Sequence, residues 1–300
     1  MNKREIWLHA VRLRTLPLSL SGIITGSALA WRMNIFDPAI FVPALFTTLF
    51  LQILSNLAND YGDAMKGTDH ADRVGPRRMV QSGALSHLEI KRGIVLVGSL
   101  AFLSGCTLLY SAFSLAQLKY VLVFLAIGLL AIWAAIQYTM GKRAYGYRGL
   151  GDVFVLIFFG FVAVSGTYFM FAKMISWPAL IQSLTIGSLA TGVLHLNNMR
   201  DRVEVEKSGK ITVAVLLGQA TAKVYFTALI LMAMASSLFT LIKTDLHLSD
   251  YMICLAFIPW ITVLIRVVKI TEAKDYNNLL KPLAISTFIY SILLFISYLV

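Results

Sequence analysis

The chain has 300 residues, of which 58% are hydrophobic and only 14% are charged, and its formal net charge is +11. A soluble globular domain carries about 25% charged residues, so this composition excludes an ordinary soluble protein. The basic residues lie in short stretches between apolar blocks, and this placement argues against a nucleic-acid partner despite the positive charge.

The apolar residues form nine blocks, each long enough to cross a bilayer as a helix of about 20 residues. A spanning barrel would instead show short segments of alternating polarity, which are absent from this sequence. The sequence therefore predicts an all-α membrane protein in which residues 1–300 form a single domain, one bundle of nine transmembrane helices. In chain order the blocks lie at 16–33, 39–58, 93–113, 118–138, 152–172, 177–196, 222–242, 251–270 and 282–300.

The distribution of lysine and arginine predicts how the bundle is oriented. With the N-terminus in the cytoplasm, 22 of these residues fall in cytoplasmic loops and four fall outside. Short cytoplasmic loops of membrane proteins carry this excess of positive charge, so we expect a cytoplasmic N-terminus and an external C-terminus. The basic stretch 3–14 is expected to form a short helix at the membrane interface and not a cleavable signal.

A polar segment, N-L-A-N-D-Y-G-D-A-M-K-G-T-D at 56–69, follows the second block. An Asp at the centre of a spanning helix costs roughly 2.5–3.5 kcal/mol on insertion scales, so acids beside a span point to function. Asn56, Asp60 and Asp63 follow the spacing i, i+4, i+7 and share one face of a helix. Hard oxygen ligands on one face suit Mg²⁺, which proteins usually share with substrate phosphates.

The segment after the sixth block repeats this spacing with Asn197, Asp201 and Glu204. The two segments lie four blocks apart, so they have the same orientation, as in a parallel duplication. If they face each other, we expect their carboxylates, together with Asp69 and Glu206, to form an acidic cage. Two Mg²⁺ ions and a substrate diphosphate would neutralise such a cage. The alternative is a pair of solvated acidic loops with ordinary ion pairs.

Basic residues follow both acidic segments and the fourth block. Arginine binds phosphate through a bidentate fork and lysine as a point charge, so cations mixed with carboxylates at one membrane face fit a diphosphate–Mg²⁺ site. Any one of these cations taken alone is equally explained by the excess of positive charge that cytoplasmic loops carry. Asp152 serves either as a helix cap or in catalysis, and His195 is expected to make a polar contact inside the bundle. The candidate phosphate-binding residues are Arg14, Arg78, Lys142, Arg143, Arg200 and Lys210.

These motifs resemble the UbiA superfamily of intramembrane prenyltransferases, and the resemblance covers nearly the whole chain. The 56–69 segment and D-R-V-G-P-R-R-M-V-Q-S-G at 72–83 are similar to the first Asp-rich motif of the family. H-L-N-N-M-R-D at 195–201 is similar to its second motif. Y-T-M-G-K-R-A-Y-G-Y-R-G-L-G-D-V-F-V-L-I-F-F-G at 138–160 resembles the branch that prenylates 1,4-dihydroxy-2-naphthoate in menaquinone synthesis.

The resemblance implies Mg²⁺-dependent transfer of a polyprenyl group to 1,4-dihydroxy-2-naphthoate, with loss of CO₂, at the cytoplasmic face of a bacterial inner membrane. It implies catalytic roles for Asp60, Asp63 and Asp201, with Asp69 assisting deprotonation of the ring. The implied metal ligands are Asn56, Asp60, Asp63, Asn197, Asp201 and Glu204.

Three positions, Leu13, Ala144 and Val205, depart from the family pattern, and the third matters most. The second motif usually places an Asp four residues after Asp201, where this chain has Val205. Glu204 lies on the same helical face as Asp201 if the helix continues, so we expect it to act as the substitute.

Two other functions are compatible with the sequence. A sister enzyme that prenylates 4-hydroxybenzoate or haem would share the Asp-rich spacing. A cation-coupled transporter would also carry acids in the membrane, although its acids would lie nearer the midplane than the ends of the helices.

Overall fold

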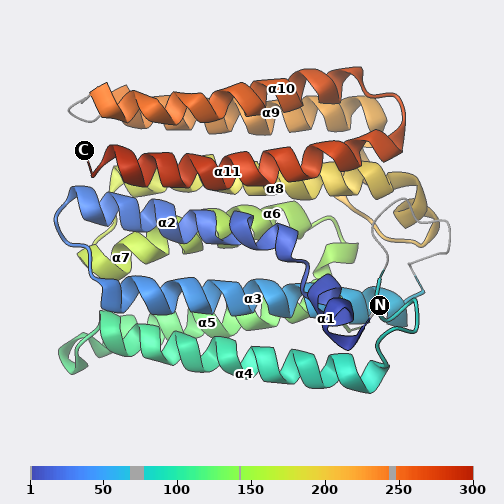
Figure 1. Cartoon of the computed structure of the whole chain (residues 1–300), viewed down its shortest axis with the longest axis horizontal. Coiled ribbons are helices and arrows are strands. Elements are labelled where there is room, and N and C mark those ends of the chain that lie inside the picture. Colours follow the sequence, from blue (N-terminus) through green and yellow to red (C-terminus); the bar gives the residue numbers. More distant parts are fainter. Residues whose placement is uncertain (1, 68–77, 142, 243–247, 300) are drawn as a thin grey trace.

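The structure is a computed structural model that describes residues 2–67, 78–141, 143–242 and 248–299, and it is almost entirely helical. A short helix precedes the bundle, and long antiparallel helices follow it (Figure 1). The helices are α1 (Lys3–Val11), α2 (Leu16–Arg32), α3 (Pro38–Met65), α4 (His87–Ala112), α5 (Leu118–Gln137), α6 (Gly151–Val155), α7 (Thr167–Ala172), α8 (Trp177–Lys207), α9 (Val213–Ile242), α10 (Phe257–Lys269) and α11 (Asn277–Ser297). The π-helical segment Leu156–Gly166 (η4) joins α6 to α7, and 3₁₀ turns lie at Leu13–Thr15 (η1), Leu115–Gln117 (η2), Tyr145–Tyr147 (η3), Leu248–Ala256 (η5) and Ala273–Tyr276 (η6).

The predicted spans are confirmed as helices. Within the described residues, eight helices are long and apolar enough to cross a membrane, counting Gly151–Ala172 and Leu248–Lys269 as one each. The block predicted at 16–33 forms α2, whose 17 residues make it shorter than each of these eight spans. The two chain ends lie at opposite ends of the bundle (Figure 1), as an odd number of passes requires.

Local sequence signals explain where several helices begin. Asn2 and Ser86 form capping boxes with the Glu three residues later, which satisfies amide groups left free in the first turn. Asp37 accepts a hydrogen bond from the amide of Ala39, and the helix starts with Pro38, whose ring fixes a helical φ. Ser176 caps α8 in the same way.

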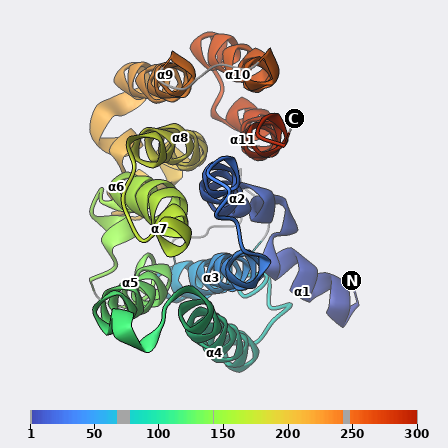
Figure 2. The ribbon, with the colours of Figure 1, turned by 90° about the vertical axis from the view of Figure 1, so that its left-hand side faces the viewer.

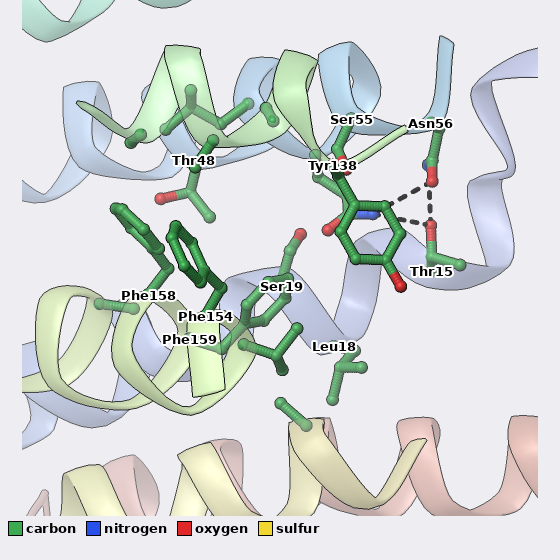
Figure 3. A pocket seen from close by; sticks show the side chains of 18 of the residues that line it. Thr15, Leu18, Ser19, Thr48, Ser55, Asn56, Tyr138, Phe154, Phe158 and Phe159 are labelled. Carbon is green, nitrogen blue, oxygen red and sulfur yellow. Dashed lines mark hydrogen bonds between the residues drawn. The ribbon is translucent and has the colours of Figure 1, made fainter. Parts of the chain in front are cut away.

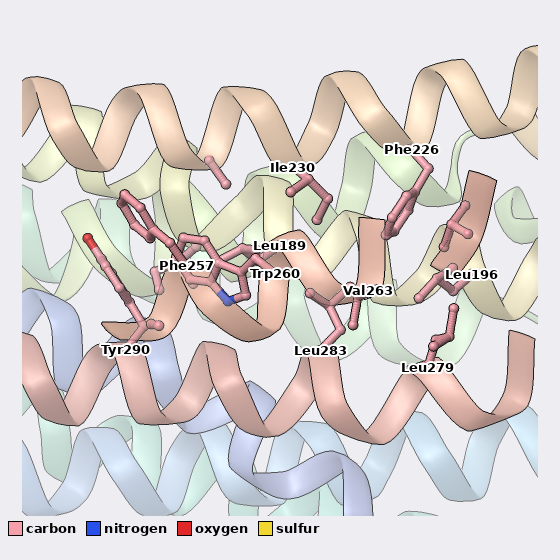
Figure 4. Packing of buried hydrophobic residues seen from close by; sticks show 14 of the residues in the cluster. Leu189, Leu196, Phe226, Ile230, Phe257, Trp260, Val263, Leu279, Leu283 and Tyr290 are labelled. Atoms are coloured by element: carbon pink, nitrogen blue, oxygen red, sulfur yellow. The ribbon is translucent and has the colours of Figure 1, made fainter. Parts of the chain in front are cut away.

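The largest apolar core lies between α8, α9, α10 and α11, at the top of Figure 1 and in close-up in Figure 4. Trp260, Phe226 and Leu283 are fully buried there, where large side chains from facing helices interlock. The hydroxyl of Tyr290 donates to the Gln182 side-chain oxygen at 2.8 Å, so this buried phenol has a polar partner. This core forms one rigid side of the molecule and carries α8, which brings in the second acidic segment.

Small residues let the π-helical segment approach its neighbours closely. A Cβ added at Gly160 would lie 2.5 Å from the carbonyl oxygen of Ser183 and 3.0 Å from Cα of Gly187, both on α8. A Cβ at Gly22 would meet Cβ of Ala163 at 2.5 Å. Membrane helices pack through such small residues because lipid supplies no hydrophobic drive between helices. The segment is therefore held between α2 and α8 by backbone contact.

We expect Gly160→Ala to destabilise the protein, because backbone atoms of α8 occupy the space that the new methyl group needs. Overpacking of this kind costs about 1–3 kcal/mol. Gly98→Ala is the matched control, since its Cβ would meet only the Leu54 side chain at ordinary contact distances of 3.8 and 3.9 Å. Thermal unfolding in detergent compares the two variants. Equal melting temperatures for the two variants would contradict the close contact.

Candidate active site

The two acidic segments occupy the ends of α3 and α8, which continue beyond the apolar blocks predicted from the sequence. α3 ends at Met65 and α8 ends at Lys207, so Asp63 and Asp201 lie on helices and not in loops. Asp63 and Asp201 are 3% and 5% exposed. The expectation that the α8 helix continues through Glu204 is confirmed.

A cavity of about 440 Å³ is lined by residues of α2, α3, α4, α5, the π-helical segment, α8 and α11. Figure 2 shows these helices from one end of the bundle, and Figure 3 shows side chains of part of the lining. Along α3 its lining runs from Ala44 to Asp63, which is about 28 Å at the helical rise of 1.5 Å per residue. One end is apolar and is lined by Phe102, Leu109, Phe124, Phe158 and Met170. The other end is polar and is lined by Arg12, Arg14, Asn56, Asn59, Asp63, Arg78, Asn197, Asp201, Glu204 and Lys210.

Asp63 contacts two cations and a phenol at the polar end of the cavity. Its carboxylate accepts from Nη2 of Arg78 at 2.7 Å and from the hydroxyl of Tyr147 at 2.9 Å. Nζ of Lys210 lies 3.7 Å away. Charge-assisted hydrogen bonds of this kind stabilise the ionised carboxylate in a buried position. The structure thus brings Arg78 and Lys210, both predicted as phosphate ligands, to the first acidic motif.

Asp201 is paired with its chain neighbour. Nε and Nη2 of Arg200 donate to its two carboxylate oxygens at 2.6 and 2.8 Å, a bidentate pair. The same guanidinium donates to the side-chain oxygens of Asn197 at 2.8 Å and Asn277 at 3.0 Å. Arg200 is buried but does not line the cavity, so in this structure it holds Asp201 and Asn197 in place.

The structure places Asp60 away from the cavity lining, unlike Asp63. Its carboxylate accepts the backbone N–H groups of Met79 at 3.0 Å and Val80 at 3.4 Å. At 3.6 residues per turn, the stripe of α3 that faces the cavity contains Gln52, Asn59 and Asp63, and Asp60 falls at its edge. Asp60 therefore secures the segment that carries Arg78.

Asn56 lines the cavity, but its side chain is engaged elsewhere. Its amide group donates to the carbonyl oxygen of Val11 at 2.8 Å and to Oγ1 of Thr15 at 3.0 Å, and its oxygen accepts from Gln52 at 3.2 Å (Figure 3). These bonds tie the N-terminal segment to α3. Asn59, one turn before Asp63, contributes a further amide to the lining.

The expected acidic cage is not formed in the part of the chain that the structure describes. No three carboxylate, histidine or cysteine side chains lie together there. The reason is that one Asp of each motif forms an ion pair with an arginine: Asp63 with Arg78, and Asp201 with Arg200. Glu206 turns outward and pairs with Arg202 at 3.8 Å. Asp69 and Lys142 lie outside the described residues, and Arg143 is exposed and does not line the cavity.

Two loops that are far apart in the sequence meet beside Asp63. The amide of Gly149 donates to the carbonyl of Ile211 at 2.8 Å, and the amide of Ile211 donates to the carbonyl of Tyr147 at 3.3 Å. Gly149 and Gly209 have φ of 74° and 73°, which favour glycine. This bridge places Tyr147 and Lys210 together, with Nζ of Lys210 4.8 Å from the tyrosine ring.

Tyr138 lines the cavity near these loops. Its ring centroid lies 5.4 Å from that of Tyr145, and Nζ of Lys210 lies 5.8 Å from the Tyr138 centroid. Tyr138 therefore packs against both loops that meet beside Asp63.

His195 and Asp152 form a polar contact inside the bundle, as predicted for His195. Nδ1 of His195 lies 3.3 Å from a carboxylate oxygen of Asp152, and Nε2 lies 3.1 Å from the carbonyl oxygen of Ala222. Neither side chain lines the cavity. The pair joins the start of α6 to α8, two residues before Asn197.

Comparison with known proteins places this geometry in a family. Residues 19–292 match the UbiA prenyltransferase family. The chain is 42% identical to the 1,4-dihydroxy-2-naphthoate octaprenyltransferase of Haemophilus influenzae over 85% of this chain and 82% of that protein. It is 43% identical to the Escherichia coli protein of the same name, over 77% and 74% of the two chains.

Solved structures show the same fold. A UbiA homolog from Archaeoglobus fulgidus, bound to GPP and Mg²⁺, has a TM-score of 0.64 at 13% identity and covers 98% of this chain and 100% of that one. The apo structure of a UbiA homolog from Aeropyrum pernix has a TM-score of 0.68 at 16% identity, over 94% and 98% of the two chains. This chain belongs to the UbiA prenyltransferase family.

Proposed function

We propose that this protein transfers a polyprenyl group from a polyprenyl diphosphate to 1,4-dihydroxy-2-naphthoate, with loss of CO₂, to give demethylmenaquinol in menaquinone synthesis. The observation that carries the proposal is one cavity, about 28 Å long along α3, that joins a charged end to an apolar end. A polyprenyl diphosphate has the same division between a charged head and a long apolar tail. The two bacterial relatives named above carry this activity in their names.

The residues at the polar end fit Mg²⁺ as the cofactor. Mg²⁺ is usually held by one or two carboxylates and by substrate phosphates, and it does not need a cage of protein ligands. Asp63 and Asp201 supply the carboxylates from opposite sides of the cavity, and Glu204 and the amides of Asn59 and Asn197 supply further oxygens. When bound, the metal would neutralise charge on the diphosphate.

The protein's own side chains account for the remaining requirements of the reaction. Arg78, Lys210 and Arg14 line the polar end and would hold the diphosphate. Their charge stabilises the departing diphosphate, so that the allylic C–O bond ionises. The apolar walls exclude water while the electron-rich ring attacks the allylic carbon. Loss of the ring carboxyl group as CO₂ then restores aromaticity.

We further infer that the polar end faces the cytoplasm of a bacterial cell and that the bundle spans the inner membrane. The excess of Lys and Arg in loops at this end supports the orientation. The motif acids lie near the ends of α3 and α8, and a transporter would be expected to hold its acids near the midplane of the membrane. This placement favours an enzyme over a transporter.

A transfer assay tests the proposed function. The purified protein is mixed with labelled polyprenyl diphosphate and either 1,4-dihydroxy-2-naphthoate or 4-hydroxybenzoate. We expect prenylated product and CO₂ with the naphthoate only, and we expect EDTA to abolish turnover and added Mg²⁺ to restore it. Prenylation of 4-hydroxybenzoate alone would assign the chain to a different branch of the family. Turnover that persists in EDTA would contradict the metal requirement.

A further inference from the structure

The wall of the cavity formed by α11 carries a cation that the proposed chemistry does not yet use. Asn277, Leu280, Lys281 and Ala284 all line the cavity. Their spacing, i, i+3, i+4 and i+7, places them on one face of the helix. Lys281 is one of the 22 Lys and Arg residues that the sequence assigns to the cytoplasmic side. Because it also lines the cavity, it can act on a ligand as well.

A hydrogen bond ties the first turn of α11 to the second acidic motif. Asn277 accepts from Arg200 at 3.0 Å, and Arg200 holds Asp201. Lys281 follows Asn277 by four residues, which is about 6 Å farther along the helix axis. The backbone of Lys281 therefore lies about one helical turn from the residues that hold the second acidic motif, toward the apolar wall.

Lys281 differs from the other cations of this site in its electrostatic surroundings. Arg78 and Lys210 are paired with Asp63, and Arg200 is paired with Asp201. No carboxylate of the described residues pairs with Lys281. A cation on a cavity wall without an acid of its own suits an anionic group on a ligand.

The cavity wall beside Lys281 is apolar and is built mainly from small side chains. Leu18 from α2, Ala190 from α8 and Ala284 from α11 are buried together, and Val193 packs against them. In Figure 3 Leu18 points toward α8 and α11, away from Phe154 and Phe158. The opposite wall carries the larger side chains of α4 and α5, where the long apolar lining lies. A two-substrate transferase needs a place for its second substrate, and this wall provides one next to the acidic site.

We propose that Lys281 binds the carboxylate of the aromatic acceptor, with the acceptor ring against Leu18, Ala190 and Ala284. The proposal rests on the proposed function and specifies which class of acceptor the site selects, namely aromatic acids. Lys281 is in this sense a specificity residue, and it takes no part in departure of the diphosphate.

The test compares Lys281→Met and Lys281→Arg with wild type, using 1,4-dihydroxy-2-naphthoate and 1,4-dihydroxynaphthalene, which lacks the carboxyl group. A hydrogen-bonded charge pair is worth a roughly 10- to 100-fold change in affinity, so Lys281→Met should raise KM for the naphthoate by about that factor. KM for the prenyl diphosphate should stay at the wild-type value. Binding of 1,4-dihydroxynaphthalene, measured by its competition with the naphthoate, should be unaffected in Lys281→Met. In Lys281→Arg the KM for the naphthoate should return close to the wild-type value.

Lys274→Met serves as the matched control. Lys274 lies just before α11, pairs with Glu272 at 2.6 Å and does not line the cavity. A wild-type KM for the naphthoate in Lys281→Met would overturn the proposal and leave Lys281 as an interfacial anchor. A rise in KM for both substrates would assign Lys281 to the diphosphate instead. The absence of transfer to the naphthoate by the wild-type protein would be a failure of the proposed function itself.

Discussion

Asp63→Asn is expected to lower the rate of prenyl transfer by roughly 10²- to 10³-fold, a loss comparable to that of removing one preorganised group that stabilises transition-state charge. The change keeps the size of the side chain but removes the negative charge that faces Arg78, Lys210 and the cavity. The initial rate at saturating substrates and Mg²⁺ measures the effect.

Asp37→Asn provides the control for the Asp63 variant. Asp37 caps α3 at the opposite end of that helix, and asparagine caps as well as aspartate does. We expect this variant to keep the wild-type rate. A folded Asp63→Asn protein with a wild-type rate would remove Asp63 from the site.

Asp201→Ala is expected to impair both stability and activity. Arg200 is buried, and removing its bidentate partner leaves a charge without compensation, which costs about 3–5 kcal/mol. The melting temperature in detergent and the transfer rate are measured on the same preparation, and both should fall.

The double variant Arg200→Met/Asp201→Ala separates the two effects. Removing the buried charge should recover much of the stability, because an apolar replacement of a buried ion pair is often close to neutral. Activity should stay low if Asp201 supplies charge to the metal site. Recovery of transfer together with stability would show that Asp201 acts only as the partner of Arg200.

Hydropathy predicted the helices of this protein well, because each span must offer an apolar surface to lipid. It misplaced the helix ends at the site. The apolar blocks stop at 58 and 196, but α3 and α8 continue to Met65 and Lys207 as polar helices. Hydropathy cannot detect such extensions, because their residues no longer contact lipid. The π-helical segment was equally hidden, since its sequence is as apolar as a regular span.

The spacing of the acidic motifs correctly brought Asp63 and Asp201 to one cavity. The spacing did not show that Asp63 lines the cavity and Asp60 does not. Residues at i, i+4 and i+7 share one face of a helix, and the neighbouring segments decide which of them point into the cavity. Tyr147 was missed for a related reason. Nothing in the sequence connects position 147 with position 63, and their contact depends on a bridge between two loops. The Tyr-Gly-Tyr run beside the predicted phosphate ligands was the only available signal.

A structure with Mg²⁺ and a thio-diphosphate analogue that cannot ionise tests the central claim most directly. We predict metal density about 2.0–2.1 Å from oxygens of Asp63 or Asp201 and of the diphosphate, with the tail running toward Phe124 and Met170. Metal and diphosphate bound away from both carboxylates, or a tail that leaves the apolar region of the cavity empty, would contradict it.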